Sequence, residues 1–94
     1  MAKYNVEYKT DVQEGVLLIV AKIENAPAKL MEYLECRVDN YYDANGLNQI
    51  EVSDNTLSMF FDVETDEEVK DTIDSVGSYI DFVLGRLDHD IVRY

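Results

Sequence analysis

Hydrophobic and polar residues alternate along the start of the chain. Residues 4–9 place Tyr or Val at every second position, with polar side chains between them, which is the period-two pattern of a half-buried strand. Residues 10–15 predict a turn. Residues 16–23 are rich in β-branched residues and almost continuously apolar, a pattern typical of a central strand covered on much of both faces. Two neighbouring strands joined by a short polar loop predict a β-hairpin.

A helix is predicted after this hairpin. Asn25 or Ala26 can cap it, and Pro27 suits its first turn because a missing N–H costs nothing there. Gly46 can take the left-handed conformation that follows the end of a helix. Between these limits, apolar residues recur at steps of four, four and three and predict a buried stripe of Leu30, Leu34, Val38 and Tyr41.

The second half repeats the order strand, strand, helix. Residues 49–53 and 56–64 alternate like the first strand, and Asp54-Asn55 between them suits a two-residue turn. Residues 65–68 have the capping-box sequence Thr-Asp-Glu-Glu, which predicts a helix start. The apolar residues of this last helix step by four and three and are expected to face the core: Val69, Ile73, Val76, Ile80, Val83 and Leu87.

These elements predict an α+β domain in the order ββα-ββα. The simplest architecture has two layers, a four-stranded antiparallel sheet with both helices on one face. No shift in composition and no linker divides the chain, so residues 1–94 are expected to form a single domain.

The composition adds a strong negative charge. Twenty Asp and Glu residues against eight Lys and Arg give a net charge of −12, while a hydrophobic content of 47% is enough for a globular core. This charge repels nucleic-acid phosphates and anionic membranes, which excludes both as partners and leaves basic proteins or cations. One cysteine, no apolar leader and no membrane-spanning run predict a cytoplasmic protein, in the host cytoplasm if a phage encodes it.

The excess charge follows the last helix. Residues 48–94 carry twelve acidic and three basic residues, net −9, whereas residues 1–47 carry eight and five, net −3. A stripe offset by two residues from the apolar one lies on the opposite side of the helix. Like charges three or four residues apart destabilise a helix. Their presence indicates either a binding surface or an ordinary solvated face that is acidic for solubility or for function at high salt. The carboxylates of this stripe are Glu67, Asp71, Asp74, Asp81 and Asp88.

The first helix and the strands add carboxylates at polar positions. Successive carboxylates on one helical stripe lie about 5 Å apart along the axis, against about 3.4 Å for the phosphates of one DNA strand. Such rows can imitate a sparse row of phosphates and occupy the basic groove of a nucleic-acid-binding protein. The additional carboxylates expected to bind a partner are Glu32, Glu35, Asp39 and Asp43 on the helix, and Glu51, Asp62 and Glu64 from the strands.

No catalytic or metal-binding constellation stands out. His89, the only histidine, lies between Asp88 and Asp90, but adjacent helical residues diverge by about 100° and do not converge on one point. Cys36 follows Glu35, which discourages a thiolate, so a buried or half-buried structural cysteine is expected. We therefore expect no enzyme, no cofactor and no metal; an enzyme that uses the trio around His89 is the alternative in that class.

Aromatic residues predict a homodimer. Phe60 falls on the polar side of its strand, where an exposed phenylalanine suggests that a second subunit covers the face. Tyr33 and Tyr42 fall at positions expected to be exposed, and tyrosine is favoured at interfaces. Packing at the edge of the core is the alternative role for these tyrosines.

In size, charge and its helical rows of carboxylates, the chain resembles the phage-encoded inhibitors that mimic DNA. This class includes antirestriction proteins of the Arn type, uracil-DNA glycosylase inhibitors and some anti-CRISPR proteins. These families share no motif, so the resemblance covers composition and charge layout and carries over no individual residue. It implies an inhibitor, often an elongated dimer, that blocks the basic surface of a restriction, CRISPR or other DNA-handling enzyme. The alternative is a small acidic adaptor or regulatory subunit that binds a protein through tyrosine and Phe60 contacts without mimicry.

Overall fold

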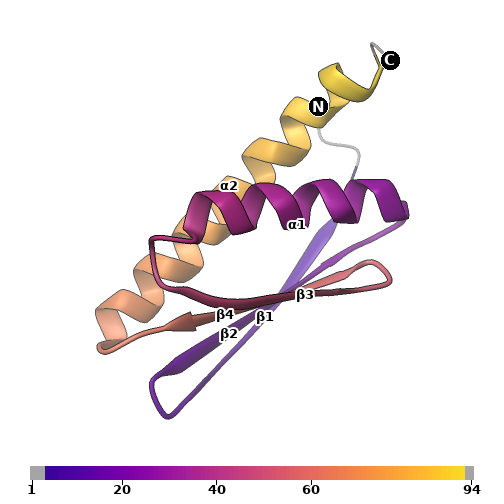
Figure 1. Ribbon diagram of the computed structural model, residues 1–94. Coiled ribbons are helices and arrows are strands. Elements are labelled where there is room, and N and C mark those ends of the chain that lie inside the picture. The colour runs from indigo at the N-terminus through magenta and orange to yellow at the C-terminus, as the bar shows by residue number, and fades with distance from the viewer. Residues whose placement is uncertain (1–3, 93–94) are drawn as a thin grey trace.

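A computed structural model describes the backbone of residues 4–92 and the side chains of residues 4–85 (Figure 1). The chain is an α+β domain in the predicted order ββα-ββα. Neither helix of this described part combines the length and apolar character that a membrane span requires. The elements are β1 (Val6–Gln13), β2 (Val16–Ile23), α1 (Ala28–Tyr42), β3 (Leu47–Ser53), β4 (Thr56–Asp62) and α2 (Asp66–Val92).

The four strands form one antiparallel sheet in the order β1-β2-β4-β3. The predicted central position of residues 16–23 is confirmed, because β2 lies between β1 and β4. A register shift between Leu47 and Gln49 marks a bulge where β3 begins to pair with β4.

The first turn is shorter than the predicted span of residues 10–15. Strand β1 continues to Gln13, which pairs with Val16, and the turn consists of Glu14 and Gly15 alone. Both turn residues have positive φ, 50° and 79°, the geometry that matches the twist of a two-residue hairpin. The largely polar run at residues 10–13, which includes the exposed Val12, is compatible with a strand because β1 is at the sheet edge, where its side chains meet solvent.

Both helices lie on one face of the sheet (Figure 1). The buried side chains of β2 and β4 alternate with half-buried or exposed ones and meet the apolar stripes of the helices. The fully or nearly fully buried core residues are Leu17, Ile19, Ala21, Ile23, Leu30, Met31, Leu34, Val38, Tyr42, Leu57, Met59, Phe61, Val63, Val76, Ile80, Val83 and Leu84. Of the predicted helical stripes, the side chain of Leu87 lies outside the described residues.

The end of α1 differs from its prediction. Tyr42 is the buried tyrosine, with 5% of its surface exposed, whereas Tyr41 is 54% exposed. The Tyr42 ring packs edge-on against Phe61 at 5.4 Å, and its hydroxyl lies 2.8 Å from Ser75 Oγ. The prediction of an exposed Tyr42 at a dimer interface is therefore wrong, because this side chain joins α1 to the sheet and to α2.

The observed ends of the two helices agree with some of the predicted capping residues and differ from others. Pro27 itself is the N-cap of α1, in extended conformation, so neither Asn25 nor Ala26 caps the helix. Gly46 has a φ of 92° as predicted, but it lies three residues after the C-cap Asp43. At α2, the hydroxyl of Thr65 accepts a hydrogen bond from the backbone N–H of Glu68, while the Glu68 carboxylate accepts one from Glu64. The capping box is thus present, except that the Glu68 carboxylate binds the backbone N–H of Glu64 instead of that of the N-cap residue Thr65.

Candidate protein-binding surfaces

The outer side of α2 carries the predicted acidic stripe. Glu67, Asp71, Asp74 and Asp81 are all exposed; the side chain of Asp88 lies outside the described residues. At about 1.5 Å per residue the four carboxylates extend over roughly 21 Å, with a gap of roughly 10 Å between Asp74 and Asp81. Among the described side chains of α2, Lys70 is the only basic one, so most of this charge is uncompensated within the helix.

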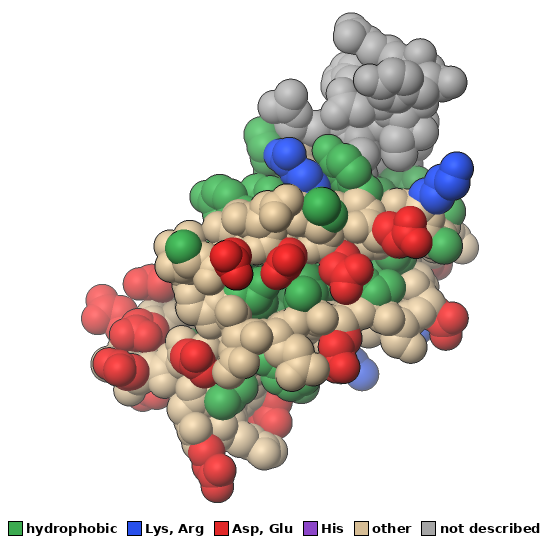
Figure 2. Space-filling model, viewed as in Figure 1, with side chains coloured by type: hydrophobic (Ala, Val, Ile, Leu, Met, Phe, Trp, Pro, Cys, Tyr) green, Lys and Arg blue, Asp and Glu red, His purple; other side chains and the backbone are tan. Residues whose placement is uncertain are grey.

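A second acidic stripe follows α1. Glu32, Asp39 and Asp43 are exposed and Glu35 is half-buried. Figure 2 shows acidic side chains in a row over α1 and a further group at the end of the molecule where α2 begins. Arg37 lies roughly half a turn away from this row, at about 100° per residue, with its guanidinium carbon 6.0 Å from the centre of the Tyr33 ring.

Neutral groups donate the hydrogen bonds that several other carboxylates accept. The side-chain amide of Gln13 donates to Asp11, that of Asn48 to Asp62, and a backbone N–H to Glu68. Such bonds hold a carboxylate in place without cancelling its charge. Asp11 and Asp62 on the sheet and Glu68 at the start of α2 therefore keep their negative charge.

Asp81 has a structural role that the helical pattern could not reveal. Tyr8 in β1 is 37% exposed; its partial burial raises the pKa of its hydroxyl above the usual tyrosine range, and the charge of Asp81 and the hydrogen bond to its carboxylate raise that pKa further. This contact joins the sheet edge to α2. Asp81 is therefore less available to a partner than Asp71 or Asp74.

We expect stability to fall at high pH through Tyr8. Because its pKa is higher in the folded chain than the ordinary value of 10.0, both states keep the proton below pH 10 and the stabilisation is fully present there. Above that pH the unfolded chain loses the proton first, so folding is progressively weakened. Thermal melts from pH 9 to 12 should show a steeper decline for the wild type than for Tyr8→Phe, and equal slopes would refute the raised pKa.

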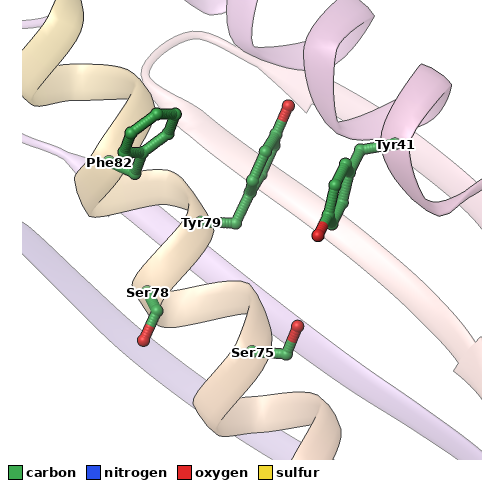
Figure 3. A pocket seen from close by; sticks show the side chains of 5 residues that line it. All are labelled: Tyr41, Ser75, Ser78, Tyr79 and Phe82. Atoms are coloured by element: carbon green, nitrogen blue, oxygen red, sulfur yellow. The ribbon is translucent and has the colours of Figure 1, made fainter.

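An aromatic groove lies between the two helices. The rings of Tyr41 and Tyr79 stack at 4.3 Å with an angle of 11° between them, and Tyr79 donates a hydrogen bond to the backbone carbonyl of Arg37. Figure 3 shows the two rings parallel, with Phe82 on the far side of Tyr79. The hollow lined by these rings, Ser75 and Ser78 has a volume of about 380 Å³.

The same groove reaches the acidic stripe of α2. A second hollow of about 350 Å³, also bordered by Tyr41, is lined by Asp71, Thr72 and Asn45. An exposed ring thus stands beside a carboxylate of the predicted binding stripe. The pattern of apolar residues does not reveal this groove; the signal in the sequence is the Tyr41-Tyr42 pair at the end of one helix together with Tyr79 in the other.

The opposite face of the sheet, which we call the open face, is not covered by a helix in the described chain. Phe60 is half-buried there, and Val16, Leu18 and Val20 of β2 share its face. Two of the carboxylates predicted to bind a partner, Glu51 and Asp62, belong to this face rather than to the helical layer. Strand alternation predicts that both residues lie on the polar side of their strands, and the arrangement of sheet and helices shows that this side is remote from the helical stripes. Glu64 is exposed between β4 and α2.

The structure does not bring the three predicted dimer residues together. Tyr33 is on α1 with 39% of its surface exposed, Tyr42 is in the core, and Phe60 is on the open face. A single interface on one face cannot include Tyr33 and Phe60, because the sheet separates them.

The expectation of a buried or half-buried Cys36 is wrong, because its side chain is exposed on α1. Its sulfur accepts a hydrogen bond from the Asn40 amide at 3.6 Å. Within the described residues, no group of His, Cys, Asp and Glu side chains has the arrangement of a metal site, and His89 lies outside the described side chains.

Comparison with protein-family models, curated proteins and solved structures finds no match to the chain.

Proposed function

We propose that the protein binds the basic nucleic-acid-binding surface of a DNA-handling protein, such as a restriction or CRISPR enzyme, and blocks it by occupying the place of DNA. The observation that carries this proposal is the pair of acidic stripes on the helical layer. Both consist of exposed or half-buried carboxylates, and both lie on the same side of the sheet.

The spacing of the carboxylates explains why both helices are needed. Steps of three or four residues correspond to axial rises of about 4.5–6 Å, whereas phosphates of one DNA strand are about 3.4 Å apart. One helix is therefore a sparse copy of one strand. Two helices supply two rows, which can engage lysine and arginine side chains that hold the two sides of a groove.

The groove between the helices supplies the apolar contact that charge does not. Tyr41 is exposed, and its stack on Tyr79 holds the ring in one orientation. An arginine of the target can stack on this ring while Asp71, at the border of the same hollow, accepts its hydrogen bonds. Aromatic and arginine anchors of this kind contribute most of the affinity at protein interfaces.

The aromatic groove is also the observation that favours the second candidate, an acidic adaptor that binds its partner without mimicry. The two functions differ in their response to salt. Electrostatic steering by exposed charges weakens as the Debye length shrinks, from about 10 Å at 0.1 M to about 3 Å at 1 M salt. Association through buried apolar contacts changes little over this range.

The experiment is capture of partners from a bacterial lysate on the immobilised protein, followed by elution with a salt gradient. We expect a basic DNA-handling protein that elutes at moderate salt and is retained poorly by a Tyr41→Ala variant. A partner without a nucleic-acid site, held through 1 M salt, would replace the mimic proposal with the adaptor.

A further inference from the structure

The two central strands present a continuous apolar strip on the open face. Leu18 of β2 is paired with Phe60 of β4, and Val16 and Val20 flank Leu18 along the same side of β2. All four side chains are half-buried rather than exposed. A shallow hollow of about 280 Å³ lies beside Leu18 and Phe60, and Asp11, Gln13 and Glu14 form its polar side.

The open face is also the less acidic face of the sheet. Strand register and alternation place four carboxylates on it and two lysines, Lys9 and Lys22. The described residues of α2 alone carry six acidic side chains against one lysine. Two copies of a chain with net charge −12 therefore approach each other with least repulsion through their open faces. The four carboxylates are Glu7, Asp11, Glu51 and Asp62.

We propose that the occupant of the open face is a second copy of the chain, packed sheet against sheet about a two-fold axis. Stacked sheets lie about 10 Å apart, a distance that side chains of the size of Leu and Phe fill. This inference does not depend on the proposed function.

Lys9, one of the two lysines on the open face, meets a carboxylate of the second copy in this arrangement. Strand pairing aligns one residue from each strand in a row across the sheet: Lys9 of β1, Val20 of β2, Ser58 of β4 and Glu51 of β3. A two-fold axis parallel to the strands places β1 opposite β3 of the second copy, and Lys9 opposite Glu51. An axis across the strands, between this row and the Leu18-Phe60 row, places Lys9 opposite Asp11. Each arrangement forms the charge pair twice.

The size of the open face limits the area that the dimer can bury. Four strands at about 4.8 Å spacing and about seven residues at 3.3 Å give a footprint of roughly 450 Å² in plan per copy. Specific interfaces bury about 800 Å² of accessible surface per partner; accessible surface exceeds plan area, but an interface confined to this footprint is at the small end, and the dimer should dissociate on dilution. The helical layers then lie on the two outer sides of the dimer, and each copy keeps its own acidic stripes accessible.

Sedimentation equilibrium over a dilution series, from submillimolar to submicromolar protein, tests the dimer. Phe60→Glu should raise the dimer dissociation constant by at least about 30-fold, the loss expected at an interface hot spot. The matched control is Tyr41→Glu, which places the same charge in an exposed aromatic position on the helical layer and should leave the constant nearly unchanged. Circular dichroism verifies the fold, and Val20→Glu replaces Phe60→Glu if the latter does not fold.

Charge exchange then identifies the axis. Lys9→Glu should weaken the dimer, and restoration by Glu51→Lys indicates the axis parallel to the strands, whereas restoration by Asp11→Lys indicates the axis across them. A wild-type monomer at every concentration would overturn the proposal. So would dissociation by Tyr41→Glu but not by Phe60→Glu, or failure of both exchanges to restore the dimer.

Discussion

Reversal of Asp71 and Asp74 to lysine is expected to lower the affinity for a basic target protein by at least about 100-fold, because like charges brought together at an interface cost several kcal/mol. Both carboxylates are exposed on α2, and Asp71 also borders the hollow beside Tyr41. The reversal removes repulsion between neighbouring acids, so stability should be unchanged or slightly higher. Isothermal titration calorimetry against the captured target measures the loss.

The matched control is reversal of Glu14 and Glu24, which changes the net charge by the same amount. Glu14 lies in the β1–β2 turn and Glu24 directly after β2, and both are exposed. Affinity should change by only a few-fold. An equal loss in both variants would show that total charge rather than the stripe directs binding, and an unchanged affinity of the Asp71 and Asp74 variant would remove the stripe from the interface.

The replacement Phe61→Ala is expected to lower the free energy of unfolding by about 3–5 kcal/mol, the usual cost of removing a buried phenylalanine ring. Phe61 is 1% exposed and lies in a central strand, with the Tyr42 ring edge-on against it. Small domains are stable by about 5–15 kcal/mol in total, so a large part of the variant should be unfolded at moderate urea. Urea titration followed by circular dichroism measures the effect.

The neighbouring residue is the control for this variant. Phe60 is adjacent in the sequence but is half-buried on the open face, so Phe60→Ala should destabilise the monomer much less than Phe61→Ala. It should instead remove the dependence of the melting temperature on protein concentration that a dimer confers. Equal destabilisation of the monomer by both substitutions would contradict the assignment of Phe61 to the core and Phe60 to the open face.

The strands and helices could be predicted largely from local pattern. Alternation at residues 49–53 and 56–62 is a property of neighbouring residues, and burial of one face follows from it directly. The predicted turn is longer than the observed one because the polar residues Thr10, Asp11 and Gln13 suit a solvent-exposed edge strand as well as a loop. Whether a strand is at the edge depends on the sheet order, which no local pattern contains.

The candidate binding surfaces could be predicted less well than the strands and helices, because they depend on tertiary contacts. Tyr41 and Tyr42 both lie near the apolar stripe of α1, and the position of α2 decides which ring enters the core and which stacks on Tyr79. The contact between Asp81 and Tyr8 joins residues far apart in sequence. Alternation predicts Glu51 on the polar side of its strand, but its distance from the helical stripes follows only from the arrangement of the sheet and the helices.

Competition with DNA tests the central claim most directly. The measurement is fluorescence anisotropy of a labelled duplex bound to the captured target, titrated with the wild-type protein at fixed salt. The account predicts complete release of the duplex, with an inhibition constant equal to the dissociation constant of the protein–target complex. A ternary complex, in which the target binds the protein while the anisotropy of the duplex stays high, would contradict mimicry.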